Sequence, residues 1–290
     1  MSIPPFLHLP NGVSARTIRT ARGEFAALDN KGAIAAGNGP DPARYALLIP
    51  GFTGSKEDFI AILAPLATAG KHAIAIDLTG QYESVGPPDA AAYSLGGFAA
   101  DVLAIIAELD GPADLVAHSM GGLVAREAVL ADPLAASSLV LMDSGPGALP
   151  PAHHQRMQLF AQVLAMQGLK TVWSAKQALE EQEGITPPTD PEIAQFLTDR
   201  FLANSPGSLI AMVDLLCTAA DRTDELAAVA PRTLVCFGDR DDVWSPAEQR
   251  AMGEVLGARI VELPDTGHSP AGERPTETAA ALLSFWASDK

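Results

Sequence analysis

Ser119 is the residue whose type and setting point most directly to chemistry. It lies in the segment Ala117–Gly122, between the apolar run Ala113–Ala117 and the helix-like stretch Leu123–Leu130. A serine at a sharp turn from a strand into a helix exposes its hydroxyl above the sheet, and the helix N-terminus favours an anion formed beside it. The pattern Gly-x-Ser-x-Gly is incomplete here, because Ala117 stands in place of the first glycine. Ser119 is a candidate nucleophile, and an ordinary strand–helix turn is the alternative.

His268 is the candidate general base. It lies in the segment Pro264–Pro270, after the last apolar run of the chain and before the final helical pattern. A serine hydroxyl is a poor nucleophile at neutral pH, and an imidazole can take its proton and later return it. We therefore expect His268 in a loop above the sheet, within reach of the nucleophile.

Short apolar runs alternate with helix-like segments, which is typical of βαβ units on a mostly parallel sheet. The expected strands of this sheet are Ala46–Ile49, His72–Asp77, Asp114–Ala117, Ser138–Met142, Leu234–Phe237 and Arg259–Leu263. Ahead of them, Ser14–Ala21 and Glu24–Leu28 flank Arg22 and Gly23 and predict an antiparallel hairpin at one edge. The pattern predicts an α/β fold in which helices flank a central sheet.

The alternation stops between about residues 146 and 221, where helix-like segments follow one another. A helical insertion between two strands of a parallel sheet most simply forms a lid over the edge where ligands bind. We therefore expect residues 1–145 and 222–290 to form the core domain, and residues 146–221 to form a helical cap.

The composition excludes some classes of partner. A formal charge of −16 opposes binding to nucleic acid or to an anionic membrane, because the protein's field repels phosphates. No run of about eighteen apolar residues occurs, and the N-terminal segment lacks the pattern of a signal peptide, which predicts a soluble cytoplasmic protein. Cys217 and Cys236 are the only cysteines, and we expect both to be small buried residues rather than a disulfide or zinc ligands.

The chain resembles the α/β-hydrolase family from about Ala46 to Trp286, excluding the helical insertion. The order of a nucleophilic serine, an acid and a late histidine is the order of this family. The resemblance implies that Asp241, in the segment Gly238–Pro246, is the acid that orients His268. The neighbouring residues Asp239 and Asp242 are alternatives, and so is Asp143, because some members carry the acid on that earlier loop.

The resemblance also implies two backbone N–H groups that bind the oxyanion of the reaction, those of Phe52 and Met120. Phe52 follows a strand, and Pro50 stands where relatives often carry a histidine. Within the expected cap, the large apolar side chains that could line a substrate pocket are Phe160, Trp173 and Met212.

The function implied by the resemblance is a serine hydrolase that cleaves a carboxylic ester, or a related lactone or thioester, through an acyl-enzyme. Its partner is a small-molecule acyl substrate, and it requires no metal and no organic cofactor. The alternatives are a non-catalytic protein that binds a small molecule on the same scaffold, or a C–C hydrolase or amide hydrolase with the same three residues.

Overall fold

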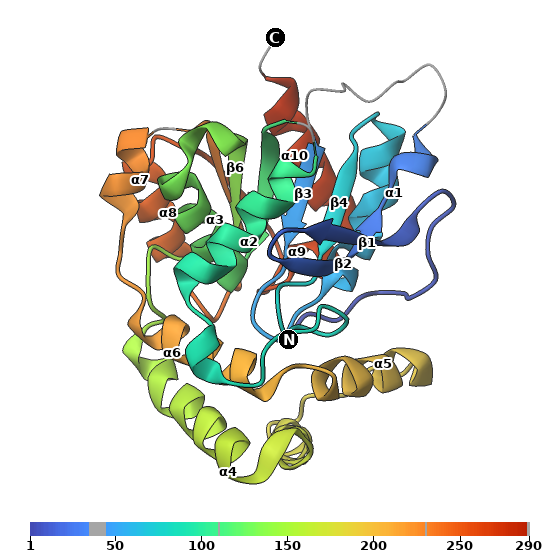
Figure 1. Ribbon diagram of the computed structural model, residues 1–290, viewed down its shortest axis with the longest axis vertical. Coiled ribbons are helices and arrows are strands. Elements are labelled where there is room, and N and C mark those ends of the chain that lie inside the picture. Colours follow the sequence, from blue (N-terminus) through green and yellow to red (C-terminus); the bar gives the residue numbers. More distant parts are fainter. Residues whose placement is uncertain (35–44, 110, 230, 289–290) are drawn as a thin grey trace.

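The computed structural model describes residues 1–34, 45–109, 111–229 and 231–288. Its centre is an eight-stranded sheet with the strand order β1-β2-β4-β3-β5-β6-β7-β8 (Figure 1). The strands are β1 Ser14–Thr20, β2 Gly23–Asp29, β3 Tyr45–Ile49, β4 Ala73–Ile76, β5 Ala113–His118, β6 Ala136–Met142, β7 Thr233–Gly238 and β8 Arg259–Leu263.

Strand β2 is antiparallel to both of its neighbours, β1 and β4. Every further pair of neighbours in this order, from β4 and β3 to β7 and β8, is parallel. The expected edge hairpin and the mostly parallel sheet are therefore both present. Strands β3 to β7 are buried along nearly their whole length, which explains why they are continuous apolar runs rather than alternating ones.

Helices cover both faces of the sheet. The longer helices are α1 Ile60–Thr68, α2 Leu95–Ala107, α3 Met120–Ala131, α4 Pro151–Gln182, α5 Pro191–Leu202, α6 Pro206–Thr218, α7 Thr223–Val229, α8 Pro246–Val255 and α10 Pro275–Ala287. The shorter ones are η1 Lys31–Ala33, η2 Lys56–Phe59, η3 Ala90–Ala92, η4 Pro133–Ala135 and α9 Pro270–Glu273. One apolar core joins α2 and α3 to the sheet, and a second joins α1 and α10 to its other face.

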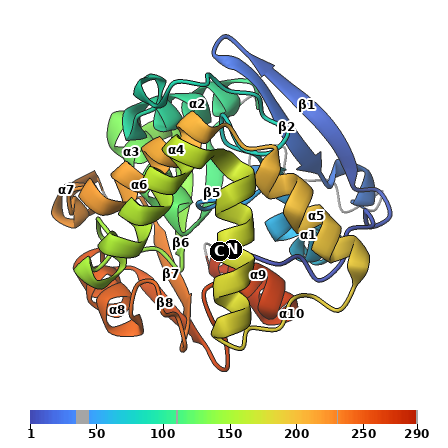
Figure 2. The same ribbon diagram turned by 90° about the horizontal axis from the view of Figure 1, so that it is seen from below.

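Helices α4, α5 and α6 lie together across one edge of the sheet, at the bottom of Figure 1. Viewed from that side, they extend over the ends of the central strands (Figure 2). They belong to the chain between β6 and β7, where the sequence predicts an insertion. Helix α4 is bent at Gly168, whose φ of 77° interrupts the helical backbone.

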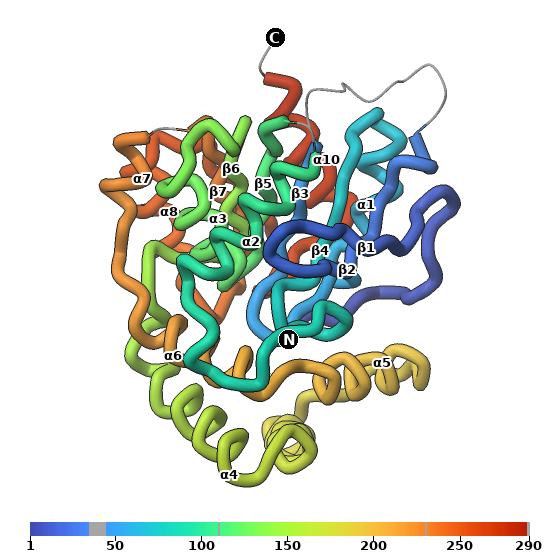
Figure 3. Tube along the Cα trace, in the orientation of Figure 1, coloured from blue at the N-terminus to red at the C-terminus, as the bar shows by residue number. Residues whose placement is uncertain are grey.

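Two sets of contacts fix the insertion to the rest of the fold. The guanidinium of Arg200 in α5 is fully buried and donates to Asp58 at 2.6 Å and to the carbonyl of Ser2 at 2.7 Å. The N-terminal residues accordingly lie between the sheet and these helices (Figure 3). Ahead of α6, the amide of Ser205 donates to the carbonyl of Gly80 at 2.8 Å.

No single helix in the described ranges is long and apolar enough to cross a membrane. The pair α5 and α6 reaches that length and composition together, but it is bent by 87° at the junction.

Candidate active site

Ser119 occupies the sharp turn between β5 and α3. Its φ of 55° and ψ of −125° lie outside the regions that a non-glycine residue prefers, and such strain is typical of functional sites. The first turn of α3 packs closely against the loop after β3, and Gly121 permits this close approach. A Cβ atom on Gly121 would lie 2.6 Å from the carbonyl oxygen of Pro50, so only glycine fits there. The predicted strand–turn–helix setting of Ser119 is present.

Ser119, His268 and Asp241 form one chain of hydrogen bonds at the carboxyl edge of the sheet. The Nε2 atom of His268 lies 3.0 Å from the Ser119 Oγ, and its Nδ1 atom lies 2.8 Å from Oδ1 of Asp241. Because a carboxylate can only accept, Nδ1 carries the hydrogen and Nε2 is free to accept the serine proton. Asp241 is held in turn by the amide of Val243 at 2.9 Å and by Nε2 of Gln249 at 2.7 Å.

The carboxyl group of Asp241 is ionised. Burial raises its pKa, but the hydrogen bond and the charge of His268 outweigh burial and leave the pKa below the ordinary value of 3.8. The ionised carboxylate accepts from Nδ1 of His268 and so holds the imidazole with Nε2 toward Ser119.

Asp143, the alternative acid, lies beside Asp241 rather than in its place. One carboxylate oxygen of each residue and one ring nitrogen of His268 all lie within 4.8 Å of one another. Asp143 is fully buried, its Oδ1 accepts from the amide of Gly238 at 3.1 Å, and its φ is 45°. Burial and the neighbouring charge of Asp241 raise the pKa of Asp143 well above its ordinary value, so it is neutral.

The arrangement of Ser119, His268 and Asp241 allows the imidazole to accept a proton from the serine while the carboxylate orients the ring. Aspartate and histidine also ligate cations, but here Nδ1 of His268 and both oxygens of Asp241 already have hydrogen-bond partners within the chain. Within the part of the chain that the structure describes, the other two alternatives, Asp239 and Asp242, form no hydrogen bond with His268. Asp239 instead accepts from the amide of Thr266 at 3.1 Å.

His118 precedes Ser119 but does not serve as its base. Its Nε2 donates to the backbone carbonyl of His268 at 2.6 Å. Burial, followed by the nearby charge of His268, lowers the pKa of His118 to about 3, so the ring stays neutral. His118 therefore fixes the loop that carries the base.

The two predicted oxyanion donors lie on either side of Ser119. Met120 is the first residue of α3, so its amide has no acceptor within the helix. Phe52 follows Gly51, and a Cβ atom on Gly51 would lie 2.7 Å from Cβ of Ser119 and 3.2 Å from its Oγ. Gly51, the residue before Phe52, is therefore packed against the nucleophile.

The apolar residues expected to line a pocket lie at different distances from this site. Phe160 of α4 packs edge-to-face on Phe52, with ring centroids 5.5 Å apart. Trp173 stacks on Phe201 of α5 at 5.1 Å, and Phe201 also contacts Phe160. Met212 of α6 is fully buried. An aromatic cluster thus joins the inserted helices to the Phe52 loop.

Gln249 and Phe201 contact the site residues but are not distinguished by the sequence. Gln249 lies eight residues after Asp241, in a helix whose start is marked by the capping box of Ser245 and Glu248, and no motif links the two side chains. Phe201 is one of many apolar residues in the insertion, and only the three-dimensional packing distinguishes it.

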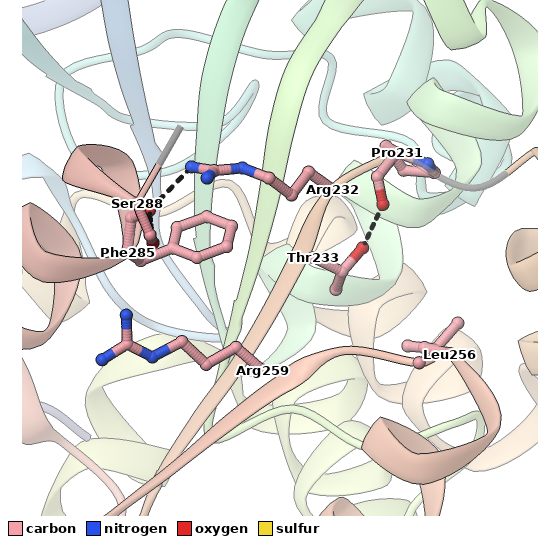
Figure 4. A pocket seen from close by; sticks show the side chains of 8 residues that line it. Pro231, Arg232, Thr233, Leu256, Arg259, Phe285 and Ser288 are labelled. Carbon is pink, nitrogen blue, oxygen red and sulfur yellow. Dashed lines mark hydrogen bonds between the residues drawn. The ribbon is translucent and has the colours of Figure 1, made fainter. Parts of the chain in front are cut away.

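A surface cleft of about 340 Å³ lies at the opposite edge of the sheet, at the amino ends of β7 and β8 (Figure 4). Its wall includes Arg232, which stacks on the ring of Phe285 and donates to its carbonyl at 2.8 Å. This cleft is separate from the site around Ser119.

The model of the alpha/beta hydrolase family matches residues 46–281. The chain belongs to this family. The match covers most of both the core and the insertion, so the predicted family and fold class are confirmed. No curated protein matches this chain closely enough to be reported as a relative.

Several solved structures share the fold. An esterase from Thermogutta terrifontis has a TM-score of 0.74 and 22% identity, over 95% of this chain and 98% of that one. An enol-lactonase from Burkholderia xenovorans has a TM-score of 0.75 and 18% identity, over 94% and 100%. A bacterial membrane phospholipase A has a TM-score of 0.73 and 24% identity, over 96% and 86%. At these identities the likeness shows the fold, and the family supports hydrolase activity.

Proposed function

We propose that this alpha/beta hydrolase is a serine hydrolase that cleaves carboxylic esters, or related lactones and thioesters, through an acyl-enzyme. The observation that carries the proposal is the pair of contacts from His268, at 3.0 Å to the Ser119 Oγ and at 2.8 Å to Asp241. A nucleophile, a base and an orienting acid at these distances constitute the arrangement that activates a serine hydroxyl.

In the first half of the reaction, Nε2 of His268 takes the proton as the Ser119 Oγ bonds to the carbonyl carbon of the ester. The negative charge on the carbonyl oxygen is bound by the amides of Phe52 and Met120. When this intermediate collapses, the bond to the alcohol oxygen breaks and His268 gives its proton to that oxygen. The products of this half are the free alcohol and an acyl group on Ser119.

In the second half, a water molecule gives a proton to His268 while its oxygen attacks the acyl carbon. The bond to the Ser119 Oγ then breaks, the serine recovers its proton from His268 and the carboxylic acid leaves. Throughout both halves Asp241 stays ionised and holds the imidazole by Nδ1.

The inserted helices, expected as a cap of residues 146–221, are proposed to enclose the acyl group. The support is the aromatic cluster of Phe160, Phe201 and Trp173, which packs on Phe52 at the oxyanion loop. An apolar wall at that position favours an apolar acyl or alcohol group on a small-molecule substrate.

Ester bonds are proposed ahead of C–C and amide bonds because of the structural neighbours. Three of these neighbours are an esterase, an enol-lactonase and a phospholipase, and a fourth is a thioesterase domain. This support comes from likeness of fold, and activity has to be tested at the site itself.

The test uses a fluorophosphonate probe and p-nitrophenyl butyrate on the wild-type protein, Ser119→Ala and the control Ser137→Ala. We expect one label per wild-type chain, located on Ser119, together with ester turnover. Ser119→Ala should stay folded, lose the label and lose several orders of magnitude in turnover, because only the oxyanion donors and binding remain. Ser137 lies at the start of β6, away from the site, so Ser137→Ala should behave as wild type. A folded wild type with neither label nor turnover would instead support a binding protein.

A further inference from the structure

Gln81 lies in the turn after β4 and is fully buried. Its side-chain oxygen accepts from the amide of Leu78 at 3.1 Å, and its Nε2 donates to the backbone carbonyl of Gly51 at 2.8 Å. The amide oxygen of Gln81 is thus held within its own turn, and the amide nitrogen contacts the loop beside the nucleophile. The sequence suggests only a structural turn for this segment, Asp77–Ser84.

The carbonyl that Gln81 binds belongs to the same peptide unit as the amide of Phe52. No cis peptide occurs in the described residues, so in this unit the C=O and the N–H point in opposite directions. Fixing the carbonyl of Gly51 therefore fixes the direction of the Phe52 N–H. The amide of Gly54 also donates to this carbonyl, at 3.1 Å, and closes the turn from the other side.

A hydrogen bond to a carbonyl also polarises the peptide and strengthens its N–H as a donor. Both effects act on the N–H of Phe52, the proposed oxyanion donor, in a loop whose Gly51 is packed on Cβ and Oγ of Ser119. The effect is larger in the transition state than in the ground state, because the oxyanion carries a full charge only after attack.

We propose that Gln81 is a positioning residue that aims and polarises the Phe52 N–H toward the oxyanion. The inference rests on the proposed function, since it assigns a role in that reaction. Gln81 is also covered by the inserted helix α6, because the Sδ of Met212 lies 4.0 Å from its Nε2. The oxyanion loop is therefore linked through one amide side chain to the helices proposed to enclose the substrate.

The test compares Gln81→Met with a matched control, Asn30→Leu. Methionine keeps the length of glutamine and removes the donor. Asn30 is also fully buried and also donates to backbone carbonyls, those of Leu63 and Lys71 at 2.9 and 3.1 Å. It contacts the amino end of β4, at the edge of the sheet opposite Ser119. Both variants lose a buried amide, and only one loses the contact to the oxyanion loop.

For p-nitrophenyl butyrate we expect Gln81→Met to lower kcat by about ten- to a hundred-fold, which is less than the loss in kcat of about 10²–10³ on deleting an oxyanion donor. The KM should change by less than about three-fold. The Ki of n-butylboronic acid, which forms a tetrahedral adduct with serine, should rise by the same factor as kcat/KM falls. Asn30→Leu should lower the melting temperature and leave kcat and the Ki unchanged.

If Gln81→Met does not fold, Gln81→Glu takes its place. The glutamate side chain can donate to the Gly51 carbonyl when it is protonated but not when it is ionised. The kcat of this variant relative to wild type should therefore fall as the pH rises and the glutamate loses its proton. The inference is overturned if the wild type is active and the folded variant retains wild-type kcat, or if KM rises in place of a fall in kcat. A wild type that neither labels at Ser119 nor hydrolyses the ester overturns the proposed function first, and the role of Gln81 with it.

Discussion

Replacing Asp143 by asparagine should raise the free energy of unfolding relative to wild type, and this difference should grow as the pH rises. Asp143 is neutral in the folded state because burial and the charge of Asp241 raise its pKa well above 3.8. In the unfolded chain it ionises near that ordinary value. A raised carboxyl pKa contributes stability that is complete below 3.8 and is lost as the pH climbs toward the folded value. Asparagine has the same shape and needs no proton.

The size of the effect follows from one proton. Between the unfolded and folded pKa values of Asp143, folding takes up one proton that the variant does not need, which costs about 1.4 kcal/mol for each pH unit. The wild type should therefore lose stability relative to Asp143→Asn at this slope from about pH 5 upward, until the pH reaches the folded pKa of Asp143. Any other effect of the amide should be a constant offset between the two curves.

The measurement is the free energy of unfolding in urea at several pH values for wild type, Asp143→Asn and the control Asp239→Asn. Asp239 is an exposed carboxyl group whose pKa is held below its ordinary value, chiefly by the hydrogen bond from Thr266. It is ionised in both states above about pH 5, so the Asp239→Asn curve should run parallel to wild type. A parallel curve for Asp143→Asn as well would refute the assignment of a neutral Asp143.

Three further predictions concern activity and stability. Asp241→Asn should lower kcat in an ester assay by about 10⁴-fold, because the imidazole loses its orienting carboxylate. Asp143→Asn should lower kcat by less than about ten-fold. A larger loss in Asp143→Asn than in Asp241→Asn would make Asp143 the acid. Arg200→Met should cost about 3–5 kcal/mol in urea unfolding by leaving Asp58 buried without its partner, and adding Asp58→Asn should recover part of that loss. His268→Ala should lower ester turnover by several orders of magnitude, because Ser119 loses its base, and wild-type turnover in the folded variant would contradict this role.

The sequence predicts the fold well because the sheet is buried on both faces. Each core strand is a short apolar run, and the six expected runs coincide with β3 to β8 within two residues. The expected hairpin before them is also present, but its turn is Ala21 and Arg22 rather than Arg22 and Gly23, because Gly23 begins β2 and pairs with Thr20. The bend of α4 at Gly168 was not predicted, because a single glycine in a helical pattern does not reveal a break.

The sequence could place the candidate residues Ser119, Asp241 and His268 at one edge of the sheet, because each lies within a few residues of the end of a parallel strand. Ser119 follows β5, Asp241 follows β7 and His268 follows β8, and parallel strands end at one edge. The residues that support them were not accessible. Gln81 and Gln249 act through single hydrogen bonds made across the fold, and nothing in their local sequence distinguishes them from other buried amides.

Strands β6 and β7 are paired in register from Leu139 with Thr233 to Met142 with Cys236, although about ninety residues separate them along the chain. The ends of the insertion are thereby anchored at neighbouring points, whatever lies between them. Ser119, His268 and Asp241 all come from outside this segment. Substitutions within it that keep the contacts of Arg200 and Met212 would therefore change the residues proposed to enclose the substrate and leave the proposed proton transfer in place.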